Sequence, residues 1–144
     1  MTNEKIKAFF DRYAHFFEQS LDGKIDTNEI SSLYAQEFIA ASPLGVMAGK
    51  NDIQFEQTLA QGYEQYRKIG TKGMTVRGVS VSPIDKLHCV AHVAWTATYS
   101  TADNPNIAID FEVHYLMQEL DGKPQIFGWI AGDEQKMLKE YGII

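Results

Sequence analysis

The stretch NIAIDFEVHYLMQELDGKPQIFGWIAGDE, residues 106–134, decides the fold of this chain. From residue 107 to residue 117 every second side chain is apolar, without interruption: Ile107, Ile109, Phe111, Val113, Tyr115 and Met117. Side chains of a β-strand point alternately to the two faces of a sheet, so this pattern predicts a strand with one buried face. The dipeptide Asp121-Gly122 predicts a tight turn, because both central residues of such a turn need a positive φ. Residues 125–131 are then expected to return as the second strand of a hairpin.

A two-residue turn at Asp121-Gly122 also sets how the two strands pair. Counting back from the turn places Tyr115 opposite Gly128 and His114 opposite Trp129. In this register the core-facing residues of the returning strand are Ile126, Gly128 and Ile130, and the outward-facing ones are Phe127, Trp129 and Ala131. A longer turn would shift the register by one residue and point Trp129 inward. Both pairings stay open at this point.

The composition is that of a single globular domain with an acidic surface, residues 1–144. Hydrophobic residues make up 44% and charged residues 22% of the chain, which is ordinary for a globular protein that buries a core. The net charge of −6 argues against a nucleic-acid or membrane partner. Cys89 is the only cysteine, which indicates a reducing compartment. The N-terminal residues show no apolar signal core, and no apolar run reaches membrane-spanning length, so we expect a cytoplasmic protein.

Helical and extended patterns divide the rest of the chain. Apolar spacing predicts helices over residues 3–21, 26–34, 51–69 and 134–141. Asp26 precedes Glu29 by three residues and Asn51 precedes Gln54 by three, which is the spacing of an N-terminal capping pair. Further strands are expected over residues 37–42, 46–50, 74–83 and 87–100. Gly62 inside the third helix costs about 1 kcal/mol relative to alanine, so it predicts a close approach of another element.

The long strands are expected to bend. A strand over residues 87–100 would span about 45 Å at roughly 3.3 Å per residue, whereas a compact domain of this size is only about 37 Å across. Gly78 is a candidate β-bulge that would help the bend. We therefore predict an α+β fold in which three N-terminal helices pack on a strongly curved, mostly antiparallel sheet of about six strands.

The concave face of this sheet is expected to collect aromatic side chains. The odd-numbered residues 87–99 are apolar and must share a face with residues 107–117, which places Trp95 near Phe111. Together with the first helix they predict an apolar, aromatic-lined pocket for a small hydrophobic or aromatic molecule, and its predicted ligand-binding residues are Tyr13, Phe17, Trp95, Tyr99 and Tyr115. Gly128 opposite Tyr115 would leave room above that ring. The alternative is that these rings only fill the core.

The convex face of the sheet is predicted to carry an apolar patch around two histidines. Contiguous exposed apolar side chains usually mark an interface, so this face predicts a homodimer. On this face His92 of one strand is expected to lie opposite one of three residues of the next strand, Glu112, His114 or Leu116. The predicted interface residues are Val90, His92, His114, Leu116, Phe127 and Trp129.

This order of elements resembles the nuclear transport factor 2-like superfamily, whose members fold as a cone-shaped, cystatin-like α+β roll. The resemblance covers nearly the whole chain. It rests on the element order and on three segments, FIAASP at residues 38–43, VAWTATY at 93–99 and LDGKPQIFGWIAGDE at 120–134. The superfamily includes ketosteroid isomerases, SnoaL-type polyketide cyclases, scytalone dehydratase and many non-catalytic binders. The resemblance also implies a homodimer through the outer face of the sheet.

The catalytic residues of these enzymes do not carry over to this chain. Where ketosteroid isomerases have a general-base Asp before a Pro, this chain has Ser42 before Pro43, and their second Asp falls near His114. Their oxyanion-binding Tyr corresponds to Tyr13, the one position of the three that matches. The cyclase Asp expected in the last strand is replaced within residues 128–131, and the residues His88, His92 and His114, of the kind that scytalone dehydratase uses, are expected to face outward.

No catalytic residue is therefore assigned, and we expect a small-molecule-binding protein. The alternatives are an isomerase-, dehydratase- or cyclase-type enzyme that acts on a small hydrophobic substrate, and a protein-interaction module that uses the outer face. Acid–base chemistry would need a carboxylate or imidazole inside the pocket, and the inner strand faces offer only Glu119, near the mouth. Asp133 and Glu134 are expected to cap the last helix.

Neither a cofactor nor a metal ion is expected. Residues 18–29 follow the calcium-binding EF-hand pattern from its third position onward, but Glu18 replaces the usual Asp and no second hand exists. A helix–turn–helix with capping residues explains the same pattern. His88 and His92 would lie about 13 Å apart along one strand, which is too far for one ion. His92, Glu112 and His114 could meet across strands, where an exposed or interfacial cluster is the expected outcome.

Overall fold

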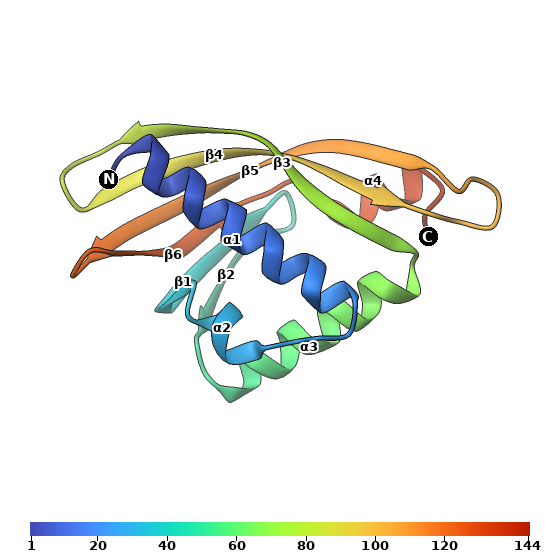
Figure 1. The fold of residues 1–144 in the computed structure, drawn as a ribbon, viewed down its shortest axis with the longest axis horizontal. Coiled ribbons are helices and arrows are strands. Elements are labelled where there is room, and N and C mark those ends of the chain that lie inside the picture. The colour runs from blue at the N-terminus through green and yellow to red at the C-terminus, as the bar shows by residue number, and fades with distance from the viewer.

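The computed structural model describes residues 1–144 and shows the predicted order of elements (Figure 1). The helices are α1 (Asn3–Leu21), α2 (Thr27–Ser31), α3 (Ile53–Lys68) and α4 (Glu134–Glu140). The strands are β1 (Tyr34–Ser42), β2 (Gly45–Lys50), β3 (Thr71–Pro83), β4 (His88–Tyr99), β5 (Ile107–Leu120) and β6 (Lys123–Ile130). They form one curved sheet in the order β2-β1-β6-β5-β4-β3, in which only β1 and β6 run parallel. The predicted α+β architecture is confirmed.

Each helix begins at a side chain that caps its first turn. Thr2 accepts a hydrogen bond from the backbone of α1, and Asp26 does so for α2, as predicted. The cap of α3 is Asp52, not Asn51, because the Asn51 amide instead donates to the carbonyls of Ser31 and Tyr34 at 2.7 and 3.0 Å. None of the helices is both long and apolar enough to cross a membrane.

The predicted second helix is shorter than the apolar spacing suggested. It ends at Ser31, and Tyr34 is already the first residue of β1. The Asn51 amide holds the carbonyl of Tyr34 and thereby fixes this change of direction. As a result the Tyr34 side chain points into the core, where it is 6% exposed, instead of lying on a helix face.

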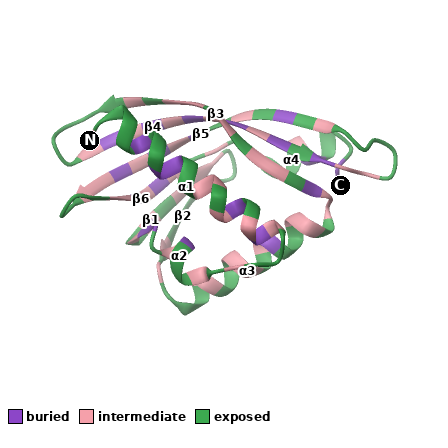
Figure 2. Cartoon of the chain, viewed as in Figure 1, coloured by how far each residue is buried: buried purple, intermediate pink, exposed green.

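The sheet buries one face against α1 and α3, and the other face lies open to solvent (Figures 1 and 2). In β4 the odd-numbered residues 89–99 are all buried and the even-numbered ones are partly or fully exposed. Trp95 pairs with Phe111, and His92 with His114, so the predicted register between these two strands is confirmed. A register shift between Val76 and Gly78 confirms the predicted bulge in β3.

The β5–β6 hairpin contains a bulge that the sequence did not reveal. Its turn is the predicted one, with Asp121 and Gly122 at φ values of 52° and 74°. Pairing follows the predicted register as far as Met117 opposite Ile126, and then shifts by one residue, so that Phe127 is the extra residue. Beyond the bulge Tyr115 lies opposite Trp129, and directly opposed residues share a face. The prediction that Trp129 and Ala131 face outward, and Gly128 and Ile130 inward, is therefore wrong.

Gly128 is needed on the outer face of the sheet. A Cβ at this position would lie 2.8 Å from Cγ1 of Ile39 and 3.0 Å from Cδ1 of Leu116. The glycine thus lets β1 pack beside β6 and leaves no room above Tyr115, contrary to the prediction. Gly62 is the reverse case. A Cβ there would meet nothing within 4 Å, so the predicted close approach is wrong and the residue borders open space.

Candidate functional site

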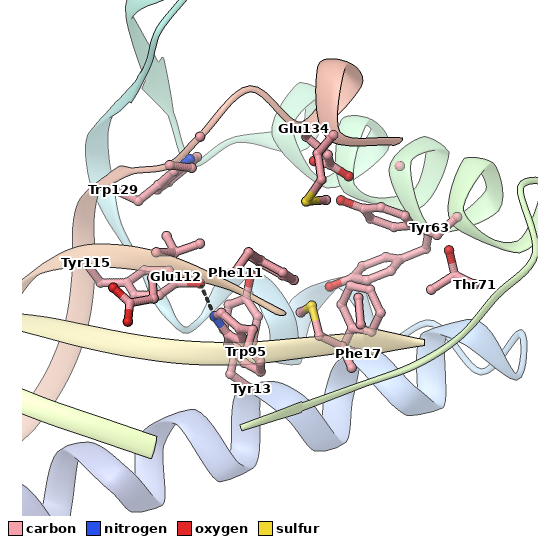
Figure 3. A pocket seen from close by; sticks show the side chains of 18 of the residues that line it. Tyr13, Phe17, Tyr63, Thr71, Trp95, Phe111, Glu112, Tyr115, Trp129 and Glu134 are labelled. Atoms are coloured by element: carbon pink, nitrogen blue, oxygen red, sulfur yellow. Dashed lines mark hydrogen bonds between the residues drawn. The ribbon is translucent and has the colours of Figure 1, made fainter. Parts of the chain in front are cut away.

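A cavity of about 570 Å³ lies between the concave face of the sheet and helices α1, α3 and α4 (Figure 3). Sixteen of its 23 lining residues are hydrophobic. All five predicted ligand-binding residues lie in its wall: Tyr13, Phe17, Trp95, Tyr99 and Tyr115. The structure thus brings the predicted residues together around open space, and their binding of a ligand stays a prediction.

Strand and helix periodicity explains this convergence. Trp95, Ala97 and Tyr99 occupy alternate positions of β4 and point to the same side, with the small Ala97 between two large rings. Tyr13 and Phe17 are one helical turn apart on α1 and face the sheet. The rings of Tyr13 and Trp95 lie 5.6 Å apart between centroids.

Sequence reasoning missed several residues of the wall. Tyr63 and Tyr66 belong to an apolar stripe of α3, whose helical spacing predicts a buried helix face but not a cavity wall. Trp129 also lines the cavity, although the register without a bulge predicts that it faces outward. Its ring stacks on Phe38 with 5.3 Å between the ring centroids. Thr71 opens β3 three residues before the predicted start of that strand. Only the α3 stripe carried a sequence signal that would have identified lining residues.

The hydroxyl of Tyr13 is the centre of a hydrogen-bond network at one side of the cavity. Tyr34 donates to it at 3.2 Å. The neighbouring Tyr115 hydroxyl accepts from Nε1 of Trp95 at 3.2 Å (Figure 3). Because the Tyr13 oxygen accepts from Tyr34, its own hydrogen is free to donate to an acceptor in the cavity.

These tyrosines are neutral at physiological pH. Loss of solvation on burial raises the pKa of Tyr13, Tyr34 and Tyr115 above that of a free phenol. Burial, followed by the charge of Glu134, raises the pKa of Tyr99 to about 12. The hydroxyls of the wall therefore act as hydrogen-bond donors and acceptors and not as phenolate bases.

Two carboxylic acids also reach the wall, namely Asp133 and Glu134, whereas Glu112 borders it from β5 with its side chain on the convex face. Asp133 caps α4 as predicted, because its carboxylate accepts from the backbone N–H of Lys136 at 3.1 Å. Glu134 lies near Tyr66, and burial, followed by the charge of Glu134, raises the pKa of that tyrosine. Glu119, the acid expected near the mouth, forms an ion pair with Lys5 of α1 and does not line the cavity.

The positions that correspond to ketosteroid isomerase carboxylates lie away from the cavity. The Ser42 hydroxyl accepts from the backbone N–H of Leu44 and thereby forms the β1–β2 turn. His114 faces the convex side of the sheet, where its Nδ1 lies 2.7 Å from Nδ1 of His92. Of the three positions that the resemblance singles out, only Tyr13 belongs to the cavity.

The convex face carries the predicted interface residues except one. Val90, Leu116 and Phe127 are half-buried there, around the His92–His114 pair. Trp129 lies on the concave face, so its assignment to the interface is wrong. Ile39 and Ile130, which are 41% and 48% exposed, extend the same patch over β1 and β6.

The residues of the EF-hand-like segment have structural partners. Asp26 caps α2, and the carboxylate of Glu29 pairs with Arg12 at 2.9 Å. Nowhere in the chain do three His, Cys, Asp or Glu side chains gather closely enough to hold a metal ion. Cys89 is buried, and burial raises the pKa of its thiol, which lowers its reactivity.

Comparisons with known proteins agree with this architecture. A family model described as "NTF2-like protein (DUF6841)" matches residues 3–134. The chain is similar to an NTF2-like protein with a cystatin-like fold from Novosphingobium aromaticivorans, with a TM-score of 0.68 and 9% identity over 98% of this chain and 87% of that one. A cystatin-like protein of unknown function from Nostoc punctiforme has a TM-score of 0.59 and 17% identity, with 89% and 91% of the chains covered. An NTF2-like protein of unknown function from Shewanella oneidensis has a TM-score of 0.60 and 10% identity, with 88% and 98% covered. No curated protein matches the sequence.

Proposed function

The chain belongs to the NTF2-like (DUF6841) family, and we propose that it is a small-molecule-binding protein with an apolar or aromatic ligand. Because one fold can serve different functions, this proposal rests on the cavity and not on the family. The observation that carries this proposal is the open volume of about 570 Å³ on the concave face. Cavities that hold small molecules typically measure about 300–1,000 Å³ and combine apolar walls with a few polar groups. A wall that only completed a core would be close-packed.

The Tyr13 network supports a ligand with a hydrogen-bond acceptor. The hydrogen bond from Tyr34 occupies the Tyr13 oxygen as an acceptor, so that the hydrogen of Tyr13 remains available as a donor. A carbonyl, ether or hydroxyl oxygen of a ligand would accept this hydrogen. The surrounding rings would bury the apolar part of the same molecule.

A thermal-shift screen of small aromatic ketones and phenols tests this function. We expect at least one compound to raise the melting temperature of the wild type, since a ligand that binds only the folded state stabilises it. The stabilisation should shrink in Tyr13→Phe, because one hydrogen bond to the ligand contributes about 1 kcal/mol. Tyr141→Phe is the matched control, since Tyr141 is 51% exposed and lies outside the cavity. A screen in which no compound stabilises the protein, or in which Tyr13→Phe responds like the wild type, contradicts the proposal.

A second candidate function is an enzyme of the isomerase, dehydratase or cyclase type that acts on a small hydrophobic substrate. The observation that favours it is Glu134, an ionisable group that borders the cavity together with Tyr66. A carboxylate so placed can accept or return a proton. Turnover of a bound ketone that is lost in Glu134→Gln would favour this function over simple binding.

We also propose that two copies of the chain associate through the convex face. Val90, Leu116 and Phe127 give this face an apolar patch that is wider than the predicted one, because Ile39 and Ile130 adjoin it. A protein-interaction module that uses the same face for a different partner is the alternative. The cytoplasm stays our proposal for its compartment, on the grounds of the single buried cysteine.

A further inference from the structure

The charged residues around the cavity are all of one sign. Among its 23 lining residues there is no lysine, arginine or histidine, whereas Asp133 and Glu134 are acids. Neither of these two carboxylates forms an ion pair within the chain. A cavity with this wall repels an anionic ligand and attracts a cationic one.

Glu134 is the carboxylate best placed to meet a ligand. Asp133 already caps α4, so the helix does not need Glu134 for that purpose. Glu134 lines both the main cavity and a smaller one beside it, and Tyr66 and Gly62 are shared by the same two walls. In Figure 3 Glu134 lies above the labelled Tyr63 ring, on the side of the cavity away from Tyr13.

A second, independent feature is an unpartnered hydroxyl in the wall. Thr71 is 8% exposed, and its Oγ1 has no hydrogen-bond partner in the protein. Buried hydroxyls are almost always paired, so an unpaired one that faces a cavity indicates that a ligand atom or a water supplies the partner. Figure 3 shows Thr71 beside Tyr63, at the end of the cavity opposite Tyr115 and Trp129.

The rings between these groups suit a positive charge. Trp95, Tyr13, Tyr63, Tyr66 and Tyr99 line the same space. The face of an aromatic ring carries partial negative charge and attracts ammonium groups, most strongly for tryptophan. Burial and the nearby Glu134 raise the pKa of Tyr66, so that its ring and hydroxyl stay neutral beside the carboxylate.

We propose that the ligand is a hydrophobic organic cation, an amine or quaternary ammonium compound, whose charged group lies at Glu134 among the tyrosine rings. This inference rests on the proposed function and specifies its ligand class. The apolar body of the ligand fills the space over Trp95 and Phe111, and a polar group of the ligand or a water pairs with Thr71. The acidic wall excludes carboxylates of the same shape.

Three probes with one aromatic body and different charges test this proposal: naphthylmethylamine, naphthylmethanol and naphthoate. Their affinities are measured by isothermal titration calorimetry near neutral pH for the wild type, Glu134→Gln and the control Glu140→Gln. Glu140 lies on the same helix, is exposed and does not line the cavity. We expect the amine to bind about tenfold more tightly than the alcohol, and the naphthoate most weakly.

Because Glu134 is exposed, Glu134→Gln should reduce this preference by weakening the amine about threefold while the alcohol is unchanged, and Glu140→Gln should change neither. If the alcohol binds as tightly as the amine, or the preference is undiminished in Glu134→Gln, the cation proposal is overturned while binding by the cavity stands. If none of the three probes binds to the wild type, both the cation proposal and the proposed function are overturned.

Discussion

At the scale of single residues, the side chains that define the cavity are those whose polar atoms are left over after the fold has formed. Tyr13 keeps a hydroxyl hydrogen because its oxygen already accepts from Tyr34. Thr71 keeps an entire hydroxyl. Glu134 keeps its carboxylate because Asp133 caps the helix. The fold uses the neighbouring groups and leaves these three polar groups at the cavity wall.

Thr71→Val should stabilise the ligand-free protein. The substitution replaces a buried hydroxyl that has no protein partner with a methyl group of similar shape and the same branching at Cβ. Removing such an unsatisfied group should raise the free energy of unfolding by about 1 kcal/mol. Urea unfolding followed by circular dichroism measures the change.

Thr75→Val serves as the matched control, since Thr75 lies on the same strand and is exposed. Its free energy of unfolding should stay within about 0.5 kcal/mol of the wild type. A Thr71→Val protein that is less stable than the wild type would mean that the hydroxyl makes a stabilising contact, for example with a bound water.

At the scale of elements, the sequence predicts what depends on one strand or helix alone. Alternation identified the buried faces of β4 and β5, and helical spacing identified α1 over its full length. These patterns follow from the geometry of a single element, because each side chain direction is set by its position along that element. They were sufficient to gather Tyr13, Phe17, Trp95, Tyr99 and Tyr115 in one wall.

The bulge in β6 depended on a second element and could not be read from the hairpin itself. Gly128 is located by its contact with Ile39 of β1, which is distant in sequence and pairs with β6 in parallel. The hairpin periodicity contains no information about that contact. One extra residue, Phe127, was enough to move Trp129 from the predicted interface into the cavity wall. The role of Glu134 was missed for a similar reason, because it depends on how α4 folds back towards α3.

At the scale of the whole molecule, the two faces of the sheet differ in what they carry. The concave face encloses the cavity, and the convex face carries the half-buried patch that we propose as a dimer interface. The patch includes the His92–His114 pair, whose Nδ1 atoms are close enough that only one proton can lie between them. The division leaves the cavity accessible from the side of α3 and α4 when the convex faces meet.

Leu116→Glu should convert a dimer to a monomer. Leu116 lies at the centre of the convex patch, opposite Gly128, and a buried carboxylate at an interface without a partner is strongly unfavourable. Light scattering coupled to size exclusion, at micromolar concentration, measures the mass. Thr98→Glu is the control, because Thr98 is exposed on the same face at the far end of β4 and should leave the mass unchanged. A monomeric wild type would contradict the proposed interface.

The claim that the cavity binds a small molecule is tested most directly by filling it. Gly62 lines the cavity, and a Cβ added there meets nothing within 4 Å, so the side chain of Gly62→Leu should extend into the ligand volume. The substitution should also raise the free energy of unfolding by up to about 1 kcal/mol, because leucine favours a helix over glycine. Gln61→Leu places the same side chain on the exposed side of α3 as a control.

The measurement is calorimetric titration of each folded variant with naphthylmethylamine. We expect Gln61→Leu to bind as the wild type does, whereas Gly62→Leu should be at least as stable as the wild type and bind at least about tenfold more weakly. A Gly62→Leu protein that is folded and binds the probe with unchanged affinity would contradict the account, since the ligand would then occupy some other part of the molecule.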